Sequence, residues 1–137
     1  SDVYKRQELY LNYAEALNEA EGPTAEVYNA VNKIRRRAQL LDLPANLTKD
    51  EMRNKIRQER RVELAFENHR FWDVRRWKIA EIVDNKKVHK ITVNADGTYS
   101  YPVFQNRVFD KAKHYLFPIP QSEIDKNRNL VQNPGWN

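Results

Sequence analysis

The sequence predicts a mostly α-helical protein of antiparallel helical hairpins, followed by one small β-hairpin and a loop-rich C-terminal tail. In the first part of the chain, apolar residues recur at helical spacing, and short stops separate the runs. From residue 88 onward, β-branched and aromatic residues surround a turn signal at residues 95–97. The tail contains Pro118, Pro120 and Pro134, which prevent long regular elements.

Length and composition favour a single globular region spanning residues 1–137. Of the 137 residues, 40% are hydrophobic and 31% charged, a balance typical of folded rather than disordered chains. No apolar run approaches the roughly 18 residues of a membrane-spanning helix, and no N-terminal signal pattern is present. The lack of cysteine excludes disulfides and thiolate chemistry. A net charge of +5 permits attraction to anionic partners without requiring it.

Two amphipathic helices are predicted first, over residues 8–20 and 24–41. Gly22 and Pro23 separate them, because glycine suits the left-handed position after a helix and proline cannot continue the hydrogen-bond ladder. So short a connection predicts an antiparallel helical hairpin. Residues 1–7 are polar and carry no matching helical period, so we interpret them as a frayed or non-native extension.

The third helix has the most specific local signal in the chain. Thr48 and Glu51 have the spacing of a capping box, and Leu47 and Met52 that of a hydrophobic staple. We expect this helix over residues 49–66, with Asn68 at its C-terminal turn. A shorter fourth helix is predicted over residues 71–83.

The remainder predicts a β-hairpin of residues 88–94 and 98–104, and then the tail. One helical turn is expected at residues 122–126. The tail carries too many large apolar residues for a free segment, so we expect them to pack over the helices. They are Tyr115, Leu116, Phe117, Ile119, Ile124, Leu130 and Trp136.

The charges of the third helix predict an internal Arg–Glu network. Glu59, Glu63 and Glu67 recur every four residues, and like charges at that spacing destabilise an isolated helix. Cations from elsewhere are therefore expected on the same face. The candidates are Arg35, Arg36, Arg37, Arg70, Arg75 and Arg76.

No pattern in the chain indicates catalysis, a metal site or a cofactor. Glutamates on adjacent turns of one helix lie side by side, whereas glycosidase carboxylates face each other across the substrate. No Glu-x-x-His spacing occurs, and His69, His89 and His114 are scattered without metal-ligand spacing. The serines lack a hydrolase elbow, and three glycines cannot build a phosphate-binding loop. We therefore predict a non-enzyme.

The basic residues of the third helix resemble a nucleic-acid footprint beside Trp72 and Trp77. Acidic residues interrupt them, however, and carboxylates near phosphates are repulsive. A solvated or internally paired face is therefore favoured, and no nucleic-acid partner is expected. The basic residues are Lys49, Arg53, Lys55, Arg57, Arg60 and Arg61.

Four aromatic residues raise the question of sugar stacking. For Trp72 and Trp77, at helical spacing, packing in the core is favoured. Tyr99 and Tyr101 are alternate residues of the predicted hairpin and share one face. For these two, ligand contact and ordinary hairpin packing are equally compatible with the pattern. They are the candidate ligand-binding residues.

Several segments, in this order, resemble one known family. They are residues 11–16 (LNYAEA), 32–38 (NKIRRRA), 56–77, 115–120 (YLFPIP), 123–124 (EI) and 129–136 (NLVQNPGW). The ordered set looks like the C-terminal part of the SusD/RagB family of outer-membrane nutrient-binding lipoproteins of Bacteroidota. The resemblance covers nearly everything from Leu9 onward, although each motif alone is weak.

The resemblance implies a fragment of a longer protein with tetratricopeptide-like helix pairs supporting an irregular ligand-binding region. Such proteins carry an N-terminal signal and a lipidated cysteine, both expected upstream of this chain. They lie on the cell surface over a TonB-dependent, SusC-like transporter, and bind oligosaccharides or other nutrients for import without catalysing a reaction. No binding residue transfers by motif match, because the matched motifs are architectural.

An alternative from another class is a tetratricopeptide-like helical adaptor that binds a protein partner. Such an adaptor repeats its helix pairs about every 34 residues. Here the pattern changes to a β-hairpin and a proline-rich tail, which favours the nutrient-binding interpretation. The pattern leaves open which nutrient is bound, which surface meets the transporter and whether residues 1–137 fold alone.

Overall fold

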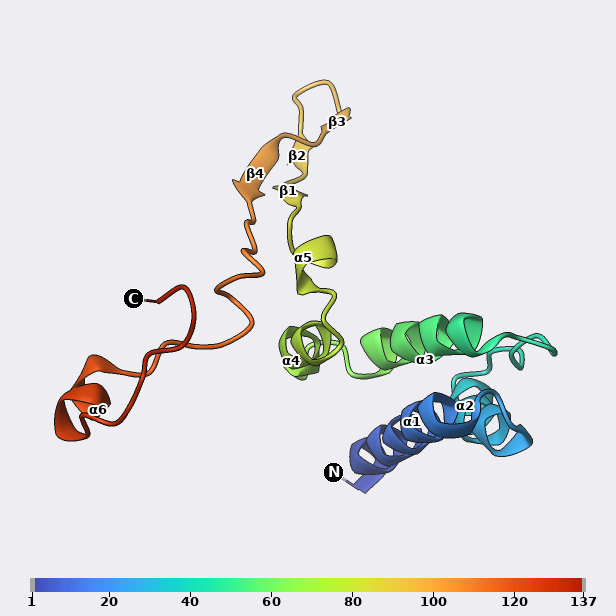
Figure 1. The fold of residues 1–137 in the computed structure, drawn as a ribbon. Coiled ribbons are helices and arrows are strands. Elements are labelled where there is room, and N and C mark those ends of the chain that lie inside the picture. The colour runs from blue at the N-terminus through green and yellow to red at the C-terminus, as the bar shows by residue number, and fades with distance from the viewer. Residues whose placement is uncertain (1, 137) are drawn as a thin grey trace. The chain divides into compact units, whose positions relative to one another are not determined.

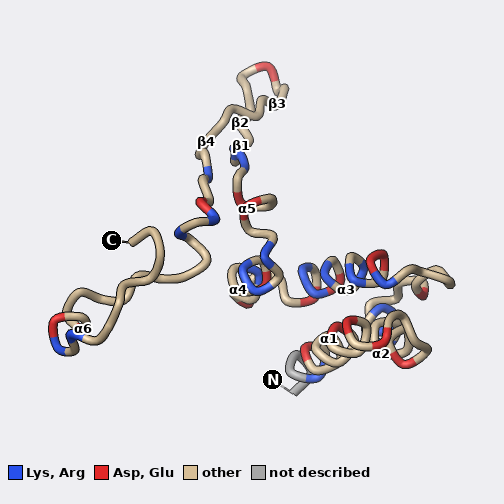
Figure 2. Tube along the Cα trace, viewed as in Figure 1, with Lys and Arg blue, Asp and Glu red and all other residues tan. Residues whose placement is uncertain are grey.

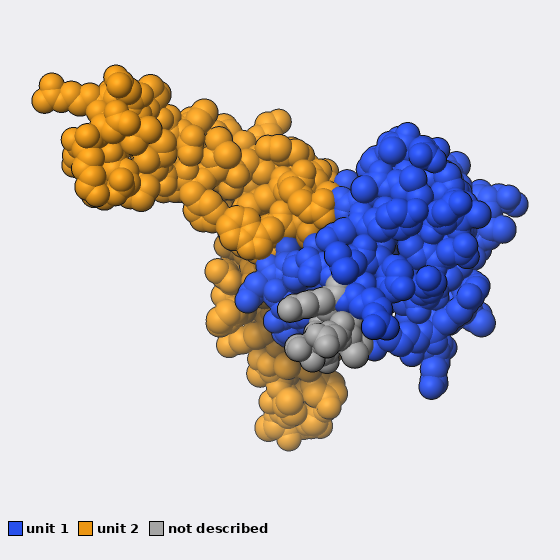
Figure 3. Space-filling model, turned by 90° about the horizontal axis from the view of Figure 1, so that it is seen from below, with its two compact units in different colours: residues 1–70 blue, residues 71–137 orange. Residues whose placement is uncertain are grey.

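The computed structural model describes residues 2–136, with side chains from residue 6 onward. The chain divides into two compact units, residues 1–70 and 71–137 (Figure 3). The assignment of both to one domain stays a prediction. In the described residues, no helix is long and apolar enough to cross a membrane.

The first unit is built on three helices, α1 (Asp2–Glu21), α2 (Ala25–Arg37) and α3 (Lys49–Glu63) (Figure 1). The predicted antiparallel hairpin of the first two is confirmed. Helix α1 begins at Asp2, not at residue 8, and Gln7 is only 5% exposed. Residues 2–7 are therefore helical, contrary to the expected frayed extension, because the hydrogen-bond ladder needs no apolar stripe to continue. Ser1 lies outside the described residues, and the interpretation of residues 1–7 as non-native stays a prediction.

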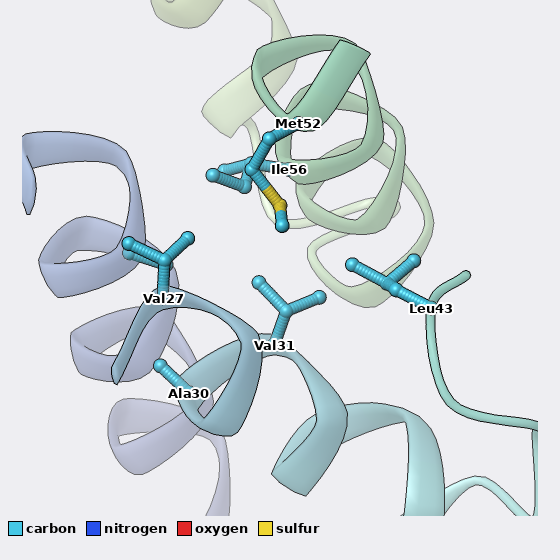
Figure 4. Packing of buried hydrophobic residues seen from close by; sticks show 7 residues of the cluster. Val27, Ala30, Val31, Leu43, Met52 and Ile56 are labelled. Atoms are coloured by element: carbon cyan, nitrogen blue, oxygen red, sulfur yellow. The ribbon is translucent and has the colours of Figure 1, made fainter. Parts of the chain in front are cut away.

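The core of the first unit lies among these three helices. Met52 and Ile56 of α3 point toward Val27 and Val31 of α2 (Figure 4). Ala14 of α1 completes this layer, and all five side chains are buried. Burying each of the larger ones stabilises the fold by about 1.5–3 kcal/mol relative to exposure. The helical spacing of Ala14, Val27 and Val31 in the sequence agrees with their place in this core.

Two buried asparagines attach loops to this core. Asn32 Oδ1 accepts a hydrogen bond from the backbone N–H of Leu43 at 2.9 Å. Asn18 Nδ2 donates to the carbonyl oxygen of Lys49 at 3.1 Å. Buried amides are tolerated where such partners exist. These bonds therefore hold the entry to α3 against the first two helices.

Helix α3 begins where the sequence predicted and ends three residues before the predicted residue 66. The N–H of Thr48 donates to Glu51 Oε2 at 2.7 Å, and the N–H of Glu51 donates to Thr48 Oγ1 at 3.2 Å. This is the predicted capping box, and Leu47 packs against the cluster that contains Met52. The helix ends at Glu63 because the following turn takes left-handed backbone at Phe66, with φ of 65°.

The predicted fourth helix is two helices. They are α4 (His69–Arg76) and α5 (Ala80–Val83). Lys78 separates them with a φ of 54°, a left-handed conformation that interrupts helical hydrogen bonding. In the second unit, Val74, Ala80 and Phe109 form a small core against which Tyr115 packs.

The β-hairpin is confirmed, with an irregularity at its base. Its tip pairs β2 (Thr92–Val93) with β3 (Tyr99–Ser100), and its base pairs β1 (Lys87–His89) with β4 (Val103–Asn106) (Figure 1). The register is the same from Val93–Tyr99 to His89–Val103, and the N–H of Lys90 donates to Pro102 O between them. Phe104 is then the extra residue of a β-bulge, because Val88 pairs with Gln105.

The tail is only partly folded back as predicted. Tyr115 packs against the small core, and the expected helical turn is present as α6 (Gln121–Lys126). Leu116, Phe117 and Leu130 are exposed, which corrects the expectation that they are covered by helices. The proline-rich segment is held by hydrogen bonds from Gln132 and Asn133, and the exposed ring of Phe117 contacts those of Phe71 and Trp72 in α4.

Candidate functional site

The β-hairpin presents one face with aromatic and aliphatic side chains, which we call the hairpin face. Side chains alternate along a strand, and paired residues share a face. The constant register therefore places six residues on this face: His89, Ile91, Val93, Tyr99, Tyr101 and Val103. Beyond the register shift, the pair Lys87–Asn106 continues the same face toward the base. Tyr99 is 61% exposed and Tyr101 63%, so both candidate residues are accessible in the described chain. Their spacing of two residues separates them by about 7 Å along the strand.

The turn at the tip fixes the position of Tyr99. Asp96 Oδ1 accepts hydrogen bonds from the N–H of Thr98 at 3.0 Å and from its hydroxyl at 2.7 Å. The hydroxyl bond, followed by the backbone bond, holds the pKa of Asp96 below its ordinary value. The N–H of Asn94 donates to Thr98 O at 2.8 Å and closes the loop. The tip is thus ordered by local contacts.

His89 links the two strands on the same face. Its Nδ1 lies 2.7 Å from the carbonyl oxygen of Tyr101. A carbonyl oxygen only accepts, so Nδ1 carries the proton of this hydrogen bond. The other ring nitrogen, Nε2, is then left for a further partner.

The predicted Arg–Glu network is confirmed for two of its three glutamates. Arg35 Nη1 lies 2.7 Å from Glu59 Oε2, and Arg37 Nη2 lies 2.6 Å from Glu63 Oε1. Arg36 instead pairs with Asp42, its Nε 2.8 Å from Oδ1, and this bond lowers the pKa of Asp42. Glu67 lies beyond the end of α3, so the predicted stacking on one helical face stops at Glu63.

Two of the downstream arginines of the predicted network, Arg75 and Arg76, bind groups of α4. Arg76 Nε lies 3.1 Å from the buried carboxylate of Asp73, and Arg75 Nη1 donates to Phe71 O at 2.9 Å. The basic residues of α3 are partly paired as well: Arg53 Nη2 donates to Glu19 at 2.7 Å, and Arg60 Nη1 donates to Asn12 at 2.7 Å. The internally paired interpretation is therefore supported for these residues.

The histidines show no clustering in the described part of the chain, where no group of three or more His, Cys, Asp or Glu residues could hold a metal ion. His69 lies in the first unit, 3.4 Å from Arg60 Nη2 and 3.9 Å from Glu8. His114 Nδ1 accepts from the N–H of Asp110 at 2.9 Å. Each histidine has its own local partner.

The prediction that Trp72 belongs to the core is wrong, since its side chain is 58% exposed. Trp77 is half-buried. Helical spacing places Trp72 away from Val74, which occupies the small core of the second unit. Its ring instead lies 5.0 Å from that of Phe71 and 5.9 Å from that of Phe117, centroid to centroid. These three rings form an exposed aromatic patch.

Three residues of the tail form hydrogen bonds that the sequence patterns did not predict. Gln132 binds both backbone groups of Ile119, and Asn133 Nδ2 donates to Phe117 O at 2.7 Å. Trp136 Nε1 donates to Lys113 O at 3.1 Å and to Leu116 O at 3.0 Å. The signal was the run of residues 132–136, QNPGW. Its side chains clamp the backbone of residues 113–119.

A hollow in the first unit is lined by residues of α1 and α2. It has a volume of about 410 Å³, and its described lining includes Arg6, Tyr10, Lys33 and Arg37. Lys33 Nζ lies 5.0 Å from the centre of the Tyr10 ring. The ion pair with Glu63 already partly neutralises Arg37. The sequence reasoning did not single out this hollow.

Comparison with known proteins identifies the family. The sequence model of the SusD family matches residues 7–136. The chain belongs to the SusD family. Among curated proteins of Formosa agariphila, the SusD-like protein P2 is 36% identical over 94% of this chain, and the SusD-like protein P25 is 30% identical over 98%. The match covers 24% of each relative, so this SusD-family chain spans about a quarter of their length.

Solved structures of the SusD family share its fold. A SusD-like protein from Bacteroides fragilis superimposes with a TM-score of 0.84 at 37% identity, covering 95% of this chain and 25% of that one. A SusD homolog from Bacteroides thetaiotaomicron gives a TM-score of 0.70 at 33% identity, covering 95% and 26%. The mostly helical, tetratricopeptide-like architecture predicted from the resemblance is thereby confirmed.

Proposed function

We propose that this chain is part of a non-catalytic cell-surface protein that binds a nutrient, in the first instance an oligosaccharide, and delivers it to a transporter. The family match over residues 7–136 is the observation that carries the proposal. The two solved SusD-like structures support it, because they share the helical architecture over 95% of the chain. Capture is non-covalent, through aromatic faces and polar groups around a solvated ligand.

Tyr99 and Tyr101 are the proposed ligand contacts. Their side chains are exposed and lie on one strand face, and their backbone positions are about 7 Å apart along the strand. Such rings suit the C–H faces of successive pyranose units. The hydrogen-bonded turn and the His89 contact pre-organise this face, which reduces the entropy lost on binding.

The proposed partner is a TonB-dependent, SusC-like transporter in the outer membrane. The full-length protein is held at the cell surface by a lipid anchor upstream of this chain. Both assignments follow from family membership. Without covalent chemistry, the ligand is handed over unchanged.

The test uses the full-length protein encoded by the complete reading frame, purified without its lipid anchor. Calorimetry against a panel of neutral and acidic oligosaccharides measures binding, and co-purification with the transporter encoded beside it measures assembly. Tyr99→Ala and Tyr101→Ala are each expected to weaken binding at least about fivefold. Tyr13→Ala is the matched control, because Tyr13 is an exposed tyrosine of α1.

One result would overturn the proposed function, and another would overturn only the proposed ligand contacts. Absence of binding to any nutrient, together with no transporter partner, would favour the helical adaptor. Oligosaccharide binding that is unchanged in both hairpin variants would retain the function but remove these two tyrosines from the site.

A further inference from the structure

The charges of the β-hairpin are strongly unbalanced. Over residues 86–107 the cations are Lys86, Lys87, Lys90 and Arg107, and the one acid is Asp96 at the tip (Figure 2). Asp96 is already bonded to Thr98. The N–H of Arg107 donates to Lys86 O at 2.9 Å, which holds these two residues together at the base. Within residues 86–107 the only acid therefore lies at the tip, and Asp84 and Asp110 lie just outside this range.

The register divides these cations between the two faces. Lys87 pairs with Asn106 and shares the face of His89, Tyr99 and Tyr101, because alternate residues of one strand point the same way. Lys90 falls on the opposite face. The bulge at Phe104 lies on the other strand, so it does not change the side of Lys87.

The hairpin face thus runs from aromatic to cationic along its length. Tyr99 and Tyr101 lie toward the tip, and His89 and Lys87 follow toward the base. Lys87 lies four residues from Ile91, the position opposite Tyr101, a distance of about 13 Å along the strand. That length exceeds a single sugar ring, so an oligosaccharide could reach from an aromatic contact to a cationic one. No carboxylate occurs at the face positions of residues 87–106.

We propose that the hairpin face binds an acidic oligosaccharide, with sugar rings on Tyr99 and Tyr101 and a carboxylate or sulfate beside Lys87. This inference rests on the proposed function and names the substrate class of the same site. Nε2 of His89 adds a polar group between the two ends, since Nδ1 is engaged with Tyr101 O. Charge complementarity selects an anionic ligand over a neutral one of the same shape.

The experiment compares two pairs of probes on the full-length protein. One pair is hexagalacturonate and its methyl ester, which differ in the carboxylate charge. The other pair is a sulfated galactan hexasaccharide and its desulfated form. Lys87→Glu is compared with Lys90→Glu, which makes the same charge change on the other face of the hairpin and serves as the matched control.

We expect the charged member of at least one pair to bind about fivefold or more tightly, with an affinity that falls as salt rises. Lys87→Glu should weaken that binding about five- to tenfold and leave the neutral member unchanged. Lys90→Glu should change it less than twofold. The pair that shows the preference identifies a carboxylate or a sulfate as the anionic group.

Equal affinities within both pairs, or equal losses in the two lysine variants, would overturn the acidic-ligand proposal. Binding of a neutral oligosaccharide that depends on Tyr101 would then leave the proposed function standing. Binding of none of the four probes also contradicts the acidic class, and the wider panel then decides the function separately. Lower thermal stability of the tyrosine variants without any change in binding would make this face an internal packing surface. That result would overturn the acidic-ligand proposal and leave the binding function standing.

Discussion

Gln132 makes both backbone hydrogen bonds of Ile119 with its side-chain amide. Oε1 accepts from the N–H of Ile119 at 2.7 Å, and Nε2 donates to its carbonyl oxygen at 2.9 Å. Ile119 lies between Pro118 and Pro120, so its N–H is the only backbone donor of that tripeptide. The Gln132 side chain therefore makes the pair of hydrogen bonds that a neighbouring strand would otherwise make with Ile119.

Replacing Gln132 by alanine should loosen the tail. Both Ile119 groups then lose their partner, at a cost of about 1–3 kcal/mol to the folded tail. Amide hydrogen exchange at Ile119 is the measurement, and exchange should become faster. Gln121→Ala is the control, because Gln121 bonds only to exposed Asp125 in α6. Unchanged protection of Ile119 would show that the clamp does not stabilise the tail.

The Arg35–Glu59 pair should contribute more to stability than the neighbouring Arg36–Asp42 pair. Glu59 is only 9% exposed, so Arg35→Ala leaves a mostly buried carboxylate without its cation. We expect a loss of about 1–3 kcal/mol of unfolding free energy, reduced from the fully buried case by partial solvent access. Denaturant unfolding measures it.

Arg36→Ala is the control for that measurement. Its pair with Asp42 is exposed on both sides, so its removal should have a much smaller effect. A double variant, Arg35→Met with Glu59→Leu, should recover most of the loss because no buried charge remains. Equal losses for Arg35→Ala and Arg36→Ala would contradict the distinction.

Gly135→Ala should destabilise the tail more than Gly97→Ala destabilises the hairpin. Both glycines have left-handed φ angles, 78° and 81°, so alanine is strained at either by about 1–2 kcal/mol. At Gly135 a Cβ would also lie 2.9 Å from Lys113 Cβ and 3.2 Å from Ala112 O, whereas at Gly97 it meets nothing within 4 Å. Thermal unfolding midpoints of the two variants are the measurement. The backbone strain is common to both, so a larger decrease for Gly135→Ala reports the steric clash. Equal shifts would contradict the packing at Gly135.

Acid should destabilise the first unit through its hydrogen-bonded carboxylates. The backbone N–H and hydroxyl of Thr48 hold the pKa of Glu51 below its ordinary 4.5, and the Arg53 guanidinium does the same for Glu19. The folded pKa lies below the unfolded one, so this stabilisation is complete above pH 4.5 and is lost as pH falls through the lowered value. Thermal midpoints between pH 6 and pH 3 test the prediction. Glu51→Gln should flatten the decline, and an unchanged slope would contradict it.

Local patterns in the sequence predicted the local structure well. The Gly22-Pro23 stop, the capping box of Thr48 and Glu51, and the turn at residues 95–97 depend on neighbours within about four residues. Short stretches of sequence are therefore enough to determine these local structures. The ordered motifs ending in NPGW likewise predicted the family. The left-handed residues Phe66 and Lys78 end helices earlier than the predicted bounds of residues 66 and 83. Apolar spacing does not indicate where the backbone becomes left-handed, so the sequence predicted these helices too long.

By itself, the sequence determined the helical hairpin, the start of the third helix at the Thr48–Glu51 capping box, and the pair of tyrosines on one hairpin face. Tertiary structure decided which partner each charge found and which aromatic rings stayed exposed. Arg36 pairs with Asp42, Trp72 lies in an exposed aromatic patch, and Gln132 forms hydrogen bonds with Ile119. The physical reason is range: helix and strand patterns follow from adjacent backbone hydrogen bonds, whereas these contacts depend on side chains that only the folded chain brings together.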